Sequence, residues 1–577
     1  MAEIPLLPAA CAHWTRQGFW CKNPGTKTCS NCKLVVYCGV SCQRAHWPEH
    51  RKQCKSAMAK QSWRPAWDCE FRRPAWAGDA AADTRHNPLG GRKHLWGNTP
   101  AIDMLQLEKN EGLDYQKDLS LLLAGESSGD LRHVVKTLSD VPETIHQQLH
   151  VVVNDGDFDV VARNVILLLL AFDGFRDEAS SVASIIEAII HVWYSAFIPQ
   201  TVFSRLQQRV KPLIDDVCSR LASENPDLVI RKSWEASNGA SLNLVLRQED
   251  WFRLRQFVNL PDGLTKEEAS RIRAAVTLAP ERADYRDRWN YKEATPFMRI
   301  AKQRFREDGL LLPFGHPRLG FDIPNPTLFQ SKTWTLHDQA DPTGGWTISA
   351  VGQRSWPAPG DWYGKLVAHL TMLLDKFITK LGKNFVCFQL FHTDARMLPL
   401  FLGARKYCRI EVSDMFDGGG FVGIHQTLST LSPYLQHPKV NPHATLITVF
   451  INAVKEMSLL ENPAGEVPNV NILSRLLPRP SMLSLAFNDS ADLTRLWDAR
   501  FLVTNVERLF QSYMAVCRFD TISAEVRVEM KADNTIVEKW PTRFNFRPGQ
   551  NGNVDEFRLR LGSIFTHLER YVEWKRR

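Results

Sequence analysis

The sequence predicts an α/β protein in which a small cysteine-rich N-terminal unit precedes a large body with a helical insertion. Three observations predict this class. Eight of the twelve cysteines lie before residue 70. A buried-strand pattern, a glycine-rich turn, a helical pattern and a second strand follow one another between residues 118 and 172. Strand patterns return after residue 346, beyond a long stretch of helical periodicity.

Composition and charge narrow the class of protein. The chain has 577 residues, of which 44% are hydrophobic and 23% charged, and this excludes a collagen-like, coiled-coil or wholly disordered chain. The net charge of +8 is concentrated in residues 1–64, where ten Lys and Arg stand against two Glu. A basic surface of this kind favours acidic partners, and nucleic acid by general attraction.

The start of the chain has no basic region followed by an apolar run, so we expect no targeting segment. The longest apolar stretch, Val165–Phe172, is far shorter than the about 20 residues of a membrane-spanning helix. We therefore expect no membrane association and an intracellular protein, cytoplasmic or nuclear.

The first 54 residues contain a ligand pattern for two metal ions. Cys29 and Cys32 form a CxxC knuckle, and two further pairs are spaced four apart, which places them on one face of a helix. We expect Gln43–Lys55 to be helical and Pro48 to divide it into two short turns. The eight candidate ligands are Cys11, Cys21, Cys29, Cys32, Cys38, Cys42, His50 and Cys54.

Eight nitrogen and sulfur ligands fit two tetrahedral zinc ions and leave no open position, which argues against a catalytic zinc. A disulfide framework is excluded because no secretion signal accompanies the cysteines. So small a segment has almost no apolar core, and metal ligation must supply its folding free energy, on the order of 10 kcal/mol.

The run Cys29–Cys54 resembles a MYND-type zinc finger in its Tyr-Cys, Cys-Gln, His-Trp and His-x3-Cys features. The resemblance implies interleaved ligands, with Cys11, Cys21, Cys38 and Cys42 on one ion and Cys29, Cys32, His50 and Cys54 on the other. It also implies a protein-interaction module, one that often takes short proline-containing peptides.

The sequence departs from this family at the first ligand pair, which is usually a CxxC. Position 18 is Gly18, so Cys11 is the one cysteine available to pair with Cys21, across a nine-residue loop. His13 is an alternative fourth ligand. We expect His46, four residues after Cys42, to be packed rather than ligating.

We divide the chain into a finger (1–57), a linker (58–95), a Rossmann-like first half (96–200), a helical and extended insertion (201–345) and an α/β C-terminal part (346–577). The linker contains Trp63, Trp67 and Trp76, which we expect to pack on the body. In the C-terminal part, strands are expected at Lys383–Leu390 and Tyr407–Ser413. Helices are expected at Leu428–Leu435, at Leu446–Val454 and, at the end of the chain, from Phe557 to Val572.

The strand–turn–helix–strand pattern is typical of Rossmann-like, nucleotide-binding folds, including methyltransferase-like ones. Such a sheet places polar residues at the carboxyl ends of its strands, where a ligand binds. The candidate cofactor-binding residues are Gly125, Gly129, Asp130, Asp155 and Asp414. The turn is not a GxGxxG sequence, however, and the alternative is that these acids cap helices and turns.

A second resemblance covers most of the body. The motifs Trp96–Asp103, Gly129–Val135 and Val161–Asn164 are similar to an uncharacterised domain that follows MYND fingers in fungal proteins. A relative of that domain forms the front of a dynein-arm assembly factor, and Arg409–Asp414 and Asn441–Thr445 resemble the later part of those proteins. The resemblance implies no known activity.

The sequence therefore favours a zinc-binding adaptor whose finger recruits a protein partner, with no catalytic residue assigned. The first alternative is an S-adenosylmethionine-dependent, methyltransferase-like enzyme. The second is a transcription-associated regulator that contacts nucleic acid through the basic finger.

Overall fold

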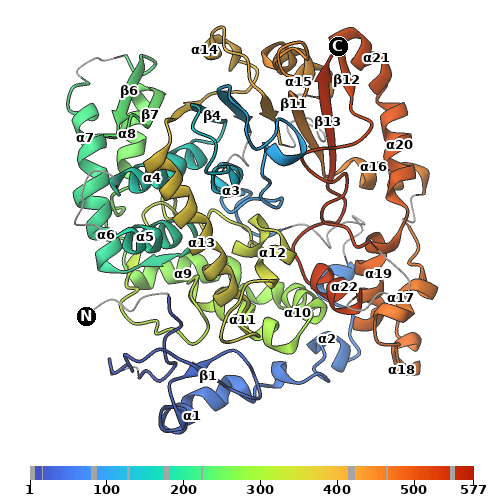
Figure 1. The fold of residues 1–577 in the computed structure, drawn as a ribbon. Helices are drawn as coiled ribbons and strands as arrows, with labels where there is room; N and C mark the ends of the chain where they lie inside the picture. Colours follow the sequence, from blue (N-terminus) through green and yellow to red (C-terminus); the bar gives the residue numbers. More distant parts are fainter. Residues whose placement is uncertain are drawn as a thin grey trace.

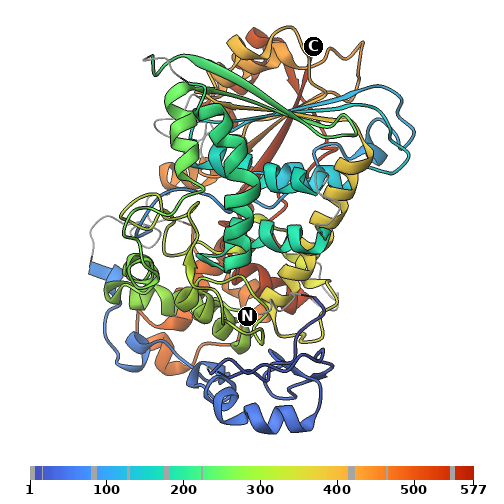
Figure 2. The same cartoon turned by 90° about the vertical axis from the view of Figure 1, so that its left-hand side faces the viewer.

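The computed structural model describes residues 7–15, 17–78, 88–125, 130–174, 181–221, 225–413, 423–462, 466–545 and 553–577. The finger forms one end of the molecule, and a large sheet with flanking helices forms the other (Figure 1). Helices from the middle of the chain lie between these ends, and the turned view in Figure 2 shows the same order. None of the helices in the described ranges combines the length and apolarity that crossing a bilayer requires.

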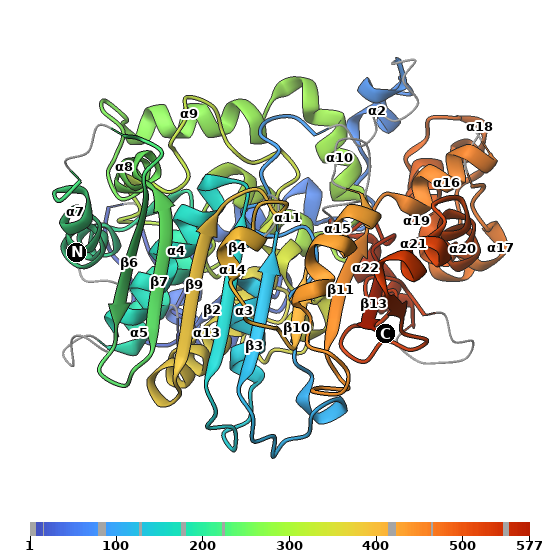
Figure 3. The same ribbon diagram turned by 90° about the horizontal axis from the view of Figure 1, so that it is seen from above.

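The large sheet contains nine strands of the described residues, which Figure 3 shows from above. In spatial order they are β12 (Val528–Met530), β13 (Arg570–Arg576), β11 (Thr445–Phe450), β10 (Arg409–Glu411), β3 (Leu119–Ala124), β4 (Leu149–Asp155), β9 (Val386–His392), β7 (Ser241–Arg247) and β6 (Val229–Glu235). The strands from β11 to β7 pair in parallel. β13 is antiparallel to β11, β12 to β13, and β6 to β7. The strand order reverses between β3 and β10.

Helices cover both faces of the sheet and bury its central strands. All six residues of β3 are buried, with Leu121 and Leu123 in one hydrophobic cluster and Leu122 and Ala124 in another. The first cluster includes side chains of α3 (Arg132–Asp140), α4 (Phe158–Asp173), α5 (Val182–Tyr194) and α13 (Trp362–Lys383). The second includes side chains of α14 (Pro399–Leu402), α15 (Ile424–Leu431), α16 (Ala453–Glu461), α20 (Val506–Val516) and α21 (Phe519–Val526). The predicted α/β class is confirmed.

The insertion is less uniformly helical than the sequence led us to expect. It contains α6 (Gln200–Arg205), a π-helical turn (Leu206–Val210), α7 (Lys211–Cys218), α8 (Gln248–Gln256), α9 (Lys266–Thr277), α10 (Ala283–Lys292) and α11 (Pro296–Asp308), with α12 (Ile348–Gly352) just beyond. A minor sheet pairs β5 (Phe197–Ile198) with β8 (Ile323–Pro324). The hairpin of β6 and β7 extends the large sheet. Leu242, Leu244 and Leu246 are buried along β7, and this period of two marks a strand.

Two predicted helices of the C-terminal part are wrong. The predicted helix Leu446–Val454 is β11 followed by α16, because the run Thr445–Phe450 is rich in β-branched residues and fully buried inside the sheet. The expected terminal helix ends at Leu561, as α22 (Asn553–Leu561), and the chain finishes as β13 beside β11. The remaining C-terminal helices are α17 (Val470–Leu476), α18 (Met482–Ala486) and α19 (Ala491–Val503).

The linker packs on the body through its tryptophans, as predicted. It contains the short helix α2 (Ala66–Cys69). Trp67 and Trp76 are buried against Tyr285 and Trp289 of α10. The indole Nε1 of Trp67 donates a hydrogen bond to the carbonyl oxygen of Asp489 over 3.1 Å. The linker thereby joins α10 to the segment that precedes α19.

Candidate metal centre

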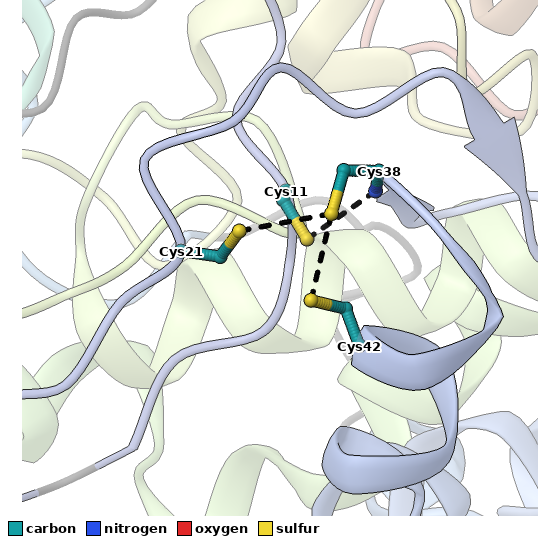
Figure 4. A group of neighbouring side chains, drawn as sticks. All are labelled: Cys11, Cys21, Cys38 and Cys42. Atoms are coloured by element: carbon teal, nitrogen blue, oxygen red, sulfur yellow. Dashed lines mark hydrogen bonds between the residues drawn. The ribbon is translucent and has the colours of Figure 1, made fainter.

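Eight side chains of the finger meet in two groups of four, and the ligand atoms of each group lie within 4.8 Å of one another. The first group, which we call the four-cysteine site, is Cys11, Cys21, Cys38 and Cys42, and its side chains point toward one common centre in Figure 4. The second group, which we call the histidine-containing site, is Cys29, Cys32, His50 and Cys54. The members of the two groups alternate along the chain, so the structure has the interleaved arrangement that the resemblance implied.

The distances between ligand atoms match those of tetrahedral zinc. Bond lengths of about 2.3 Å to sulfur and about 2.0 Å to nitrogen imply sulfur–sulfur edges of about 3.8 Å and sulfur–nitrogen edges of about 3.5 Å. In the four-cysteine site the Sγ atom of Cys38 lies 3.7 Å from that of Cys21 and 3.5 Å from that of Cys42.

The histidine-containing site fits zinc equally well. The Sγ atoms of Cys29 and Cys54 are 3.9 Å apart. The Nε2 atom of His50 lies 3.4 Å from Sγ of Cys29 and 3.5 Å from Sγ of Cys32. The residues therefore suit two zinc ions, with formal charges of about −2 at the four-cysteine site and about −1 at the histidine-containing site.

A short hairpin and one helix place the ligands. The hairpin pairs β1 (Lys27–Thr28) with β2 (Val36–Tyr37), and α1 (Val40–Cys54) follows it. Cys42, His50 and Cys54 project from α1 at intervals of eight and four residues, which keeps them on one side of the helix.

α1 continues through Pro48, so the prediction of two separate turns is wrong. Proline removes one backbone hydrogen bond of a helix interior. Here the helix is held on both sides of Pro48, by Cys42 before it and by His50 and Cys54 after it. Ligation therefore explains why the helix is not broken.

Backbone and amide N–H groups point at the thiolates. The backbone N–H of Cys38 lies 3.4 Å from Sγ of Cys11, and that of Leu34 lies 3.5 Å from Sγ of Cys32. The side-chain amide of Asn31 donates to Sγ of Cys54 over 3.2 Å. Such donors stabilise the negative charge on the ligands and orient them.

Cys11, rather than His13, completes the four-cysteine site. The loop from His13 to Cys21 folds back on itself, with the N–H of Cys21 bonded to the carbonyl oxygen of His13 over 2.9 Å. Gly18 forms the bend at a φ of +96°, a conformation that glycine adopts without strain. His46 is packed, as expected, since its Nδ1 lies 3.1 Å from the hydroxyl of Tyr37.

The two sites differ in burial. The four ligands of the histidine-containing site are between 0% and 3% exposed, whereas Cys21, Cys38 and Cys42 of the four-cysteine site are partly exposed. The turn between Cys32 and Cys38 carries Leu34 and Val35, which pack in the same hydrophobic cluster as the body. Gly315 of the body lies so close that a Cβ there would contact Val35.

The body also covers the hairpin of the finger. The proline-containing segment Trp356–Gly360 lies along it, with the N–H of Gly360 bonded to the carbonyl oxygen of Lys33 over 2.9 Å. The Thr28 hydroxyl donates to the carbonyl oxygen of Pro357 over 2.5 Å. Trp356 and Ala358 pack with Val36 in one small cluster. This face of the finger is therefore in contact with the chain itself.

The exposed side of α1 and the residue that follows it form what we call the basic stripe, defined by Arg44, Arg51, Lys52 and Lys55. Their spacing matches the 3.6-residue period of a helix, and the zinc ligands occupy the opposite side. Composition reveals these charges only as a total for residues 1–64, and not as one face of a helix. The signal was present in the spacing of the basic residues relative to Cys42, His50 and Cys54.

Two of the candidate cofactor residues, Gly125 and Asp155, lie at the carboxyl ends of parallel strands. Gly125 follows β3, and its N–H donates to the carbonyl oxygen of Asn154 in β4 over 3.1 Å. Asp155 ends β4, and its Oδ1 accepts a hydrogen bond from the N–H of Asp157 over 2.7 Å. Gly129 and Asp414 lie outside the described residues.

Asp130, the remaining candidate, is buried before α3 and forms a salt bridge with Arg132. Burial raises the pKa of its carboxyl group above the ordinary range. Asp130 and Asp155 thus each have a partner within the chain. Their role in binding a cofactor stays a prediction.

Comparisons with known proteins identify the two parts that the sequence suggested. The MYND finger family matches residues 19–54, and a domain of unknown function, DUF4470, matches residues 95–198. The chain therefore contains a MYND finger followed by this domain. No solved structure matches the chain.

The curated relatives match this chain over short stretches. "SET domain and MYND-type zinc finger protein 6" of Schizosaccharomyces pombe is 35% identical over 61 residues, 10% of this chain and 13% of the relative. "N-lysine methyltransferase SMYD2" of Gallus gallus is 36% identical over 50 residues, 8% of this chain and 12% of the relative. "Tudor domain-containing protein 1" of Oryzias latipes is 43% identical over 49 residues, 8% of this chain and 4% of the relative. The chain thus spans at most about an eighth of these relatives.

Proposed function

We propose that this protein is a zinc-dependent adaptor whose finger recruits an acidic partner peptide and whose body is the scaffold that carries the finger. The observation that carries the proposal is the basic stripe on α1, which the zinc ligands on the opposite side hold in place. Two four-ligand sites leave no coordination position for a substrate, which is typical of structural zinc. The match to MYND fingers supports an interaction role by resemblance.

The basic stripe is the face of the finger that we expect a partner to use. The hairpin side is in contact with Trp356–Gly360 of the body, whereas Arg44 and Arg51 are exposed. The one acid on this helix, Glu49, is paired with Lys52 at 3.0 Å. Val40, at the start of α1, is 50% exposed and offers an apolar contact beside the charges. Complementary charge of this kind steers and selects acidic partners.

The test is peptide selection on the full-length, zinc-loaded chain. We expect the selected peptides to be rich in Asp and Glu, and the double variant Arg44→Glu/Arg51→Glu to bind them at least about tenfold more weakly. A matched double variant of exposed lysines on the body, Lys376→Glu/Lys439→Glu, should bind like the parent. If the stripe variant keeps both zinc ions and still binds the peptides as tightly, the proposal fails.

We infer further that the body is a Rossmann-like domain. Its parallel strands, helices on both faces and reversal of strand order between β3 and β10 support this assignment. The antiparallel strand β13, which lies between β11 and β12, supports the methyltransferase-like form of the fold. The candidate residues Gly125 and Asp155 stand at the carboxyl ends of β3 and β4, the edge at which such sheets bind ligands.

This placement keeps a methyltransferase-like enzyme as the second candidate function. It predicts saturable S-adenosylmethionine binding by calorimetry, lost in Asp155→Ala. The adaptor proposal predicts no saturable binding of S-adenosylmethionine at concentrations up to about millimolar. Binding weaker than that would be negligible as recognition. If the protein were instead a nucleic-acid-binding regulator, nucleic acid would bind the basic stripe with an affinity that falls steeply as the salt concentration rises.

A further inference from the structure

A cavity of about 280 Å³ lies where the linker, the insertion and the C-terminal helices meet. In Figure 1 the helices α10, α17, α19 and α22 gather in this part of the molecule. Six basic side chains line the cavity: Arg64, Lys292, Arg299, Arg479, Arg495 and Arg558. They come from the linker, from α10 and α11, from α19 and α22, and from the segment that follows α17.

Two acids line the same cavity, and both already have cationic partners. Asp492 accepts hydrogen bonds from the hydroxyl of Tyr291 at 2.8 Å, from Arg495 at 2.9 Å and from Arg64 at 3.0 Å. Glu293 forms a salt bridge with Lys302 at 2.6 Å. The lining therefore has a clear excess of positive charge.

Two of the guanidinium groups keep a buried N–H without an acceptor among the described residues. Arg299 is only 5% exposed, and its Nη1 donates to the carbonyl oxygen of Met58, but its Nε has no hydrogen-bond acceptor. The Nε of Arg495 is also buried without an acceptor. A buried donor without an acceptor destabilises a fold, so an acceptor in the cavity would stabilise this one.

Arg299 remains a cation at neutral pH. Burial lowers the pKa of Arg299 to about 10 and also lowers that of Lys292, because a buried charge is poorly solvated. A cation in such a place attracts an anion more strongly than it would in water. Arg479, which follows α17, and Arg558 of α22 are more accessible and complete the ring of charge.

We propose that this cavity binds a small phosphorylated molecule. Guanidinium groups match the geometry of phosphate oxygens and bind them through paired N–H groups. The volume is close to the lower end of the range for small-molecule sites, about 300–1,000 Å³, which suits a nucleotide-sized ligand and not a folded macromolecule. Leu477, Pro478 and Leu561 supply an apolar wall for the part of the ligand that carries no charge.

Calorimetry on the full-length protein with inorganic phosphate, pyrophosphate and AMP tests the proposal. We expect saturable binding of pyrophosphate or AMP, tighter than that of inorganic phosphate. Arg479→Gln and Arg558→Gln should each weaken it about tenfold, since each removes one charge-assisted contact. Arg475→Gln, an exposed arginine of α17 outside the lining, is the matched control and should bind like the parent.

A thermal melt of the same proteins provides the second readout. A ligand that binds the folded state raises the melting temperature, and the rise should disappear in Arg479→Gln/Arg558→Gln while both zinc ions are retained. The proposal is overturned if none of the three probes binds up to about 10 mM. It is equally overturned if Arg475→Gln weakens binding as much as the lining variants do, or if phosphopeptides bind and the small phosphates do not.

Discussion

A chelator should remove the two zinc ions at clearly different rates, with the ion of the four-cysteine site leaving first. Three of its ligands, Cys21, Cys38 and Cys42, are partly exposed, so a chelator can approach this ion from solvent. The ligands of the histidine-containing site are at most 3% exposed. Access to that ion requires the turn between Cys32 and Cys38 to leave the body.

The magnitude follows from the side chains that this opening exposes. Leu34 and Val35 are 1% and 2% exposed, and each contributes roughly 2 kcal/mol when buried. Opening the turn therefore costs about 4 kcal/mol, and at about 1.4 kcal/mol for each factor of ten the second ion should leave roughly several hundred to a thousand times more slowly.

A colorimetric chelator in excess provides the assay, with total zinc measured on the same sample. We expect two phases of equal amplitude, each one zinc per chain. Cys42→Ala should lack the fast phase and Cys32→Ala the slow one. A single phase in the parent, or a fast phase that survives in Cys42→Ala, would refute the assignment of ligands to sites.

Three further predictions concern the body. Trp67→Ala should lower the free energy of unfolding in urea by about 3–5 kcal/mol, because it leaves a cavity between the linker and α10. Phe71, in the same linker, is exposed, and Phe71→Ala should change the free energy of unfolding by less than about 0.5 kcal/mol. Arg409→Leu should lower the free energy of unfolding by about 3–5 kcal/mol, because it leaves the buried carboxylate of Glu111 without its two hydrogen bonds of 2.7 and 2.8 Å from Arg409. Replacing both Arg409 and Glu111 by apolar residues should recover part of the loss. Burial lowers the pKa of His567 to about 3, against 6.5 in the unfolded chain. The unfolded chain therefore binds the proton more readily, and the free energy of unfolding falls as the pH drops below about 6.5, by about 2 kcal/mol at pH 5. His567→Asn should remove that part of the pH dependence.

The sequence predicted the features that depend on local pattern. The strand Leu119–Ala124 and the helix Phe158–Asp173 are each largely apolar and long enough to be predicted without knowledge of their tertiary contacts. The ligands of both zinc ions could be named because a metal accepts few residue types at few spacings. For Cys11 the sequence left His13 open as an alternative, because Cys21 is reached through a loop whose bend depends on Gly18.

The errors occur where a distant part of the chain decides the outcome. Thr445–Phe450 fits either a helix or a strand by periodicity, and its place between β10 and β13 makes it a strand. β13 itself pairs with β11 across a long separation in the sequence, which no local pattern reveals. In the finger, Pro48 predicted a break, and ligands on both sides of it keep the helix continuous. Long-range pairing and metal ligation overrode local preference in these cases.

The contact between finger and body changes what zinc is expected to do in this protein. A finger on a free tether would lose its own fold on chelation and leave the rest of the chain unaffected. Here Cys29, Cys32 and Leu34 belong to the same hydrophobic cluster as the strands and helices of the body. Trp356–Gly360 is bonded to the hairpin as well. Loss of the buried zinc should therefore expose apolar surface on both partners, so that zinc holds the basic stripe in a fixed position relative to the scaffold as well as folding the finger.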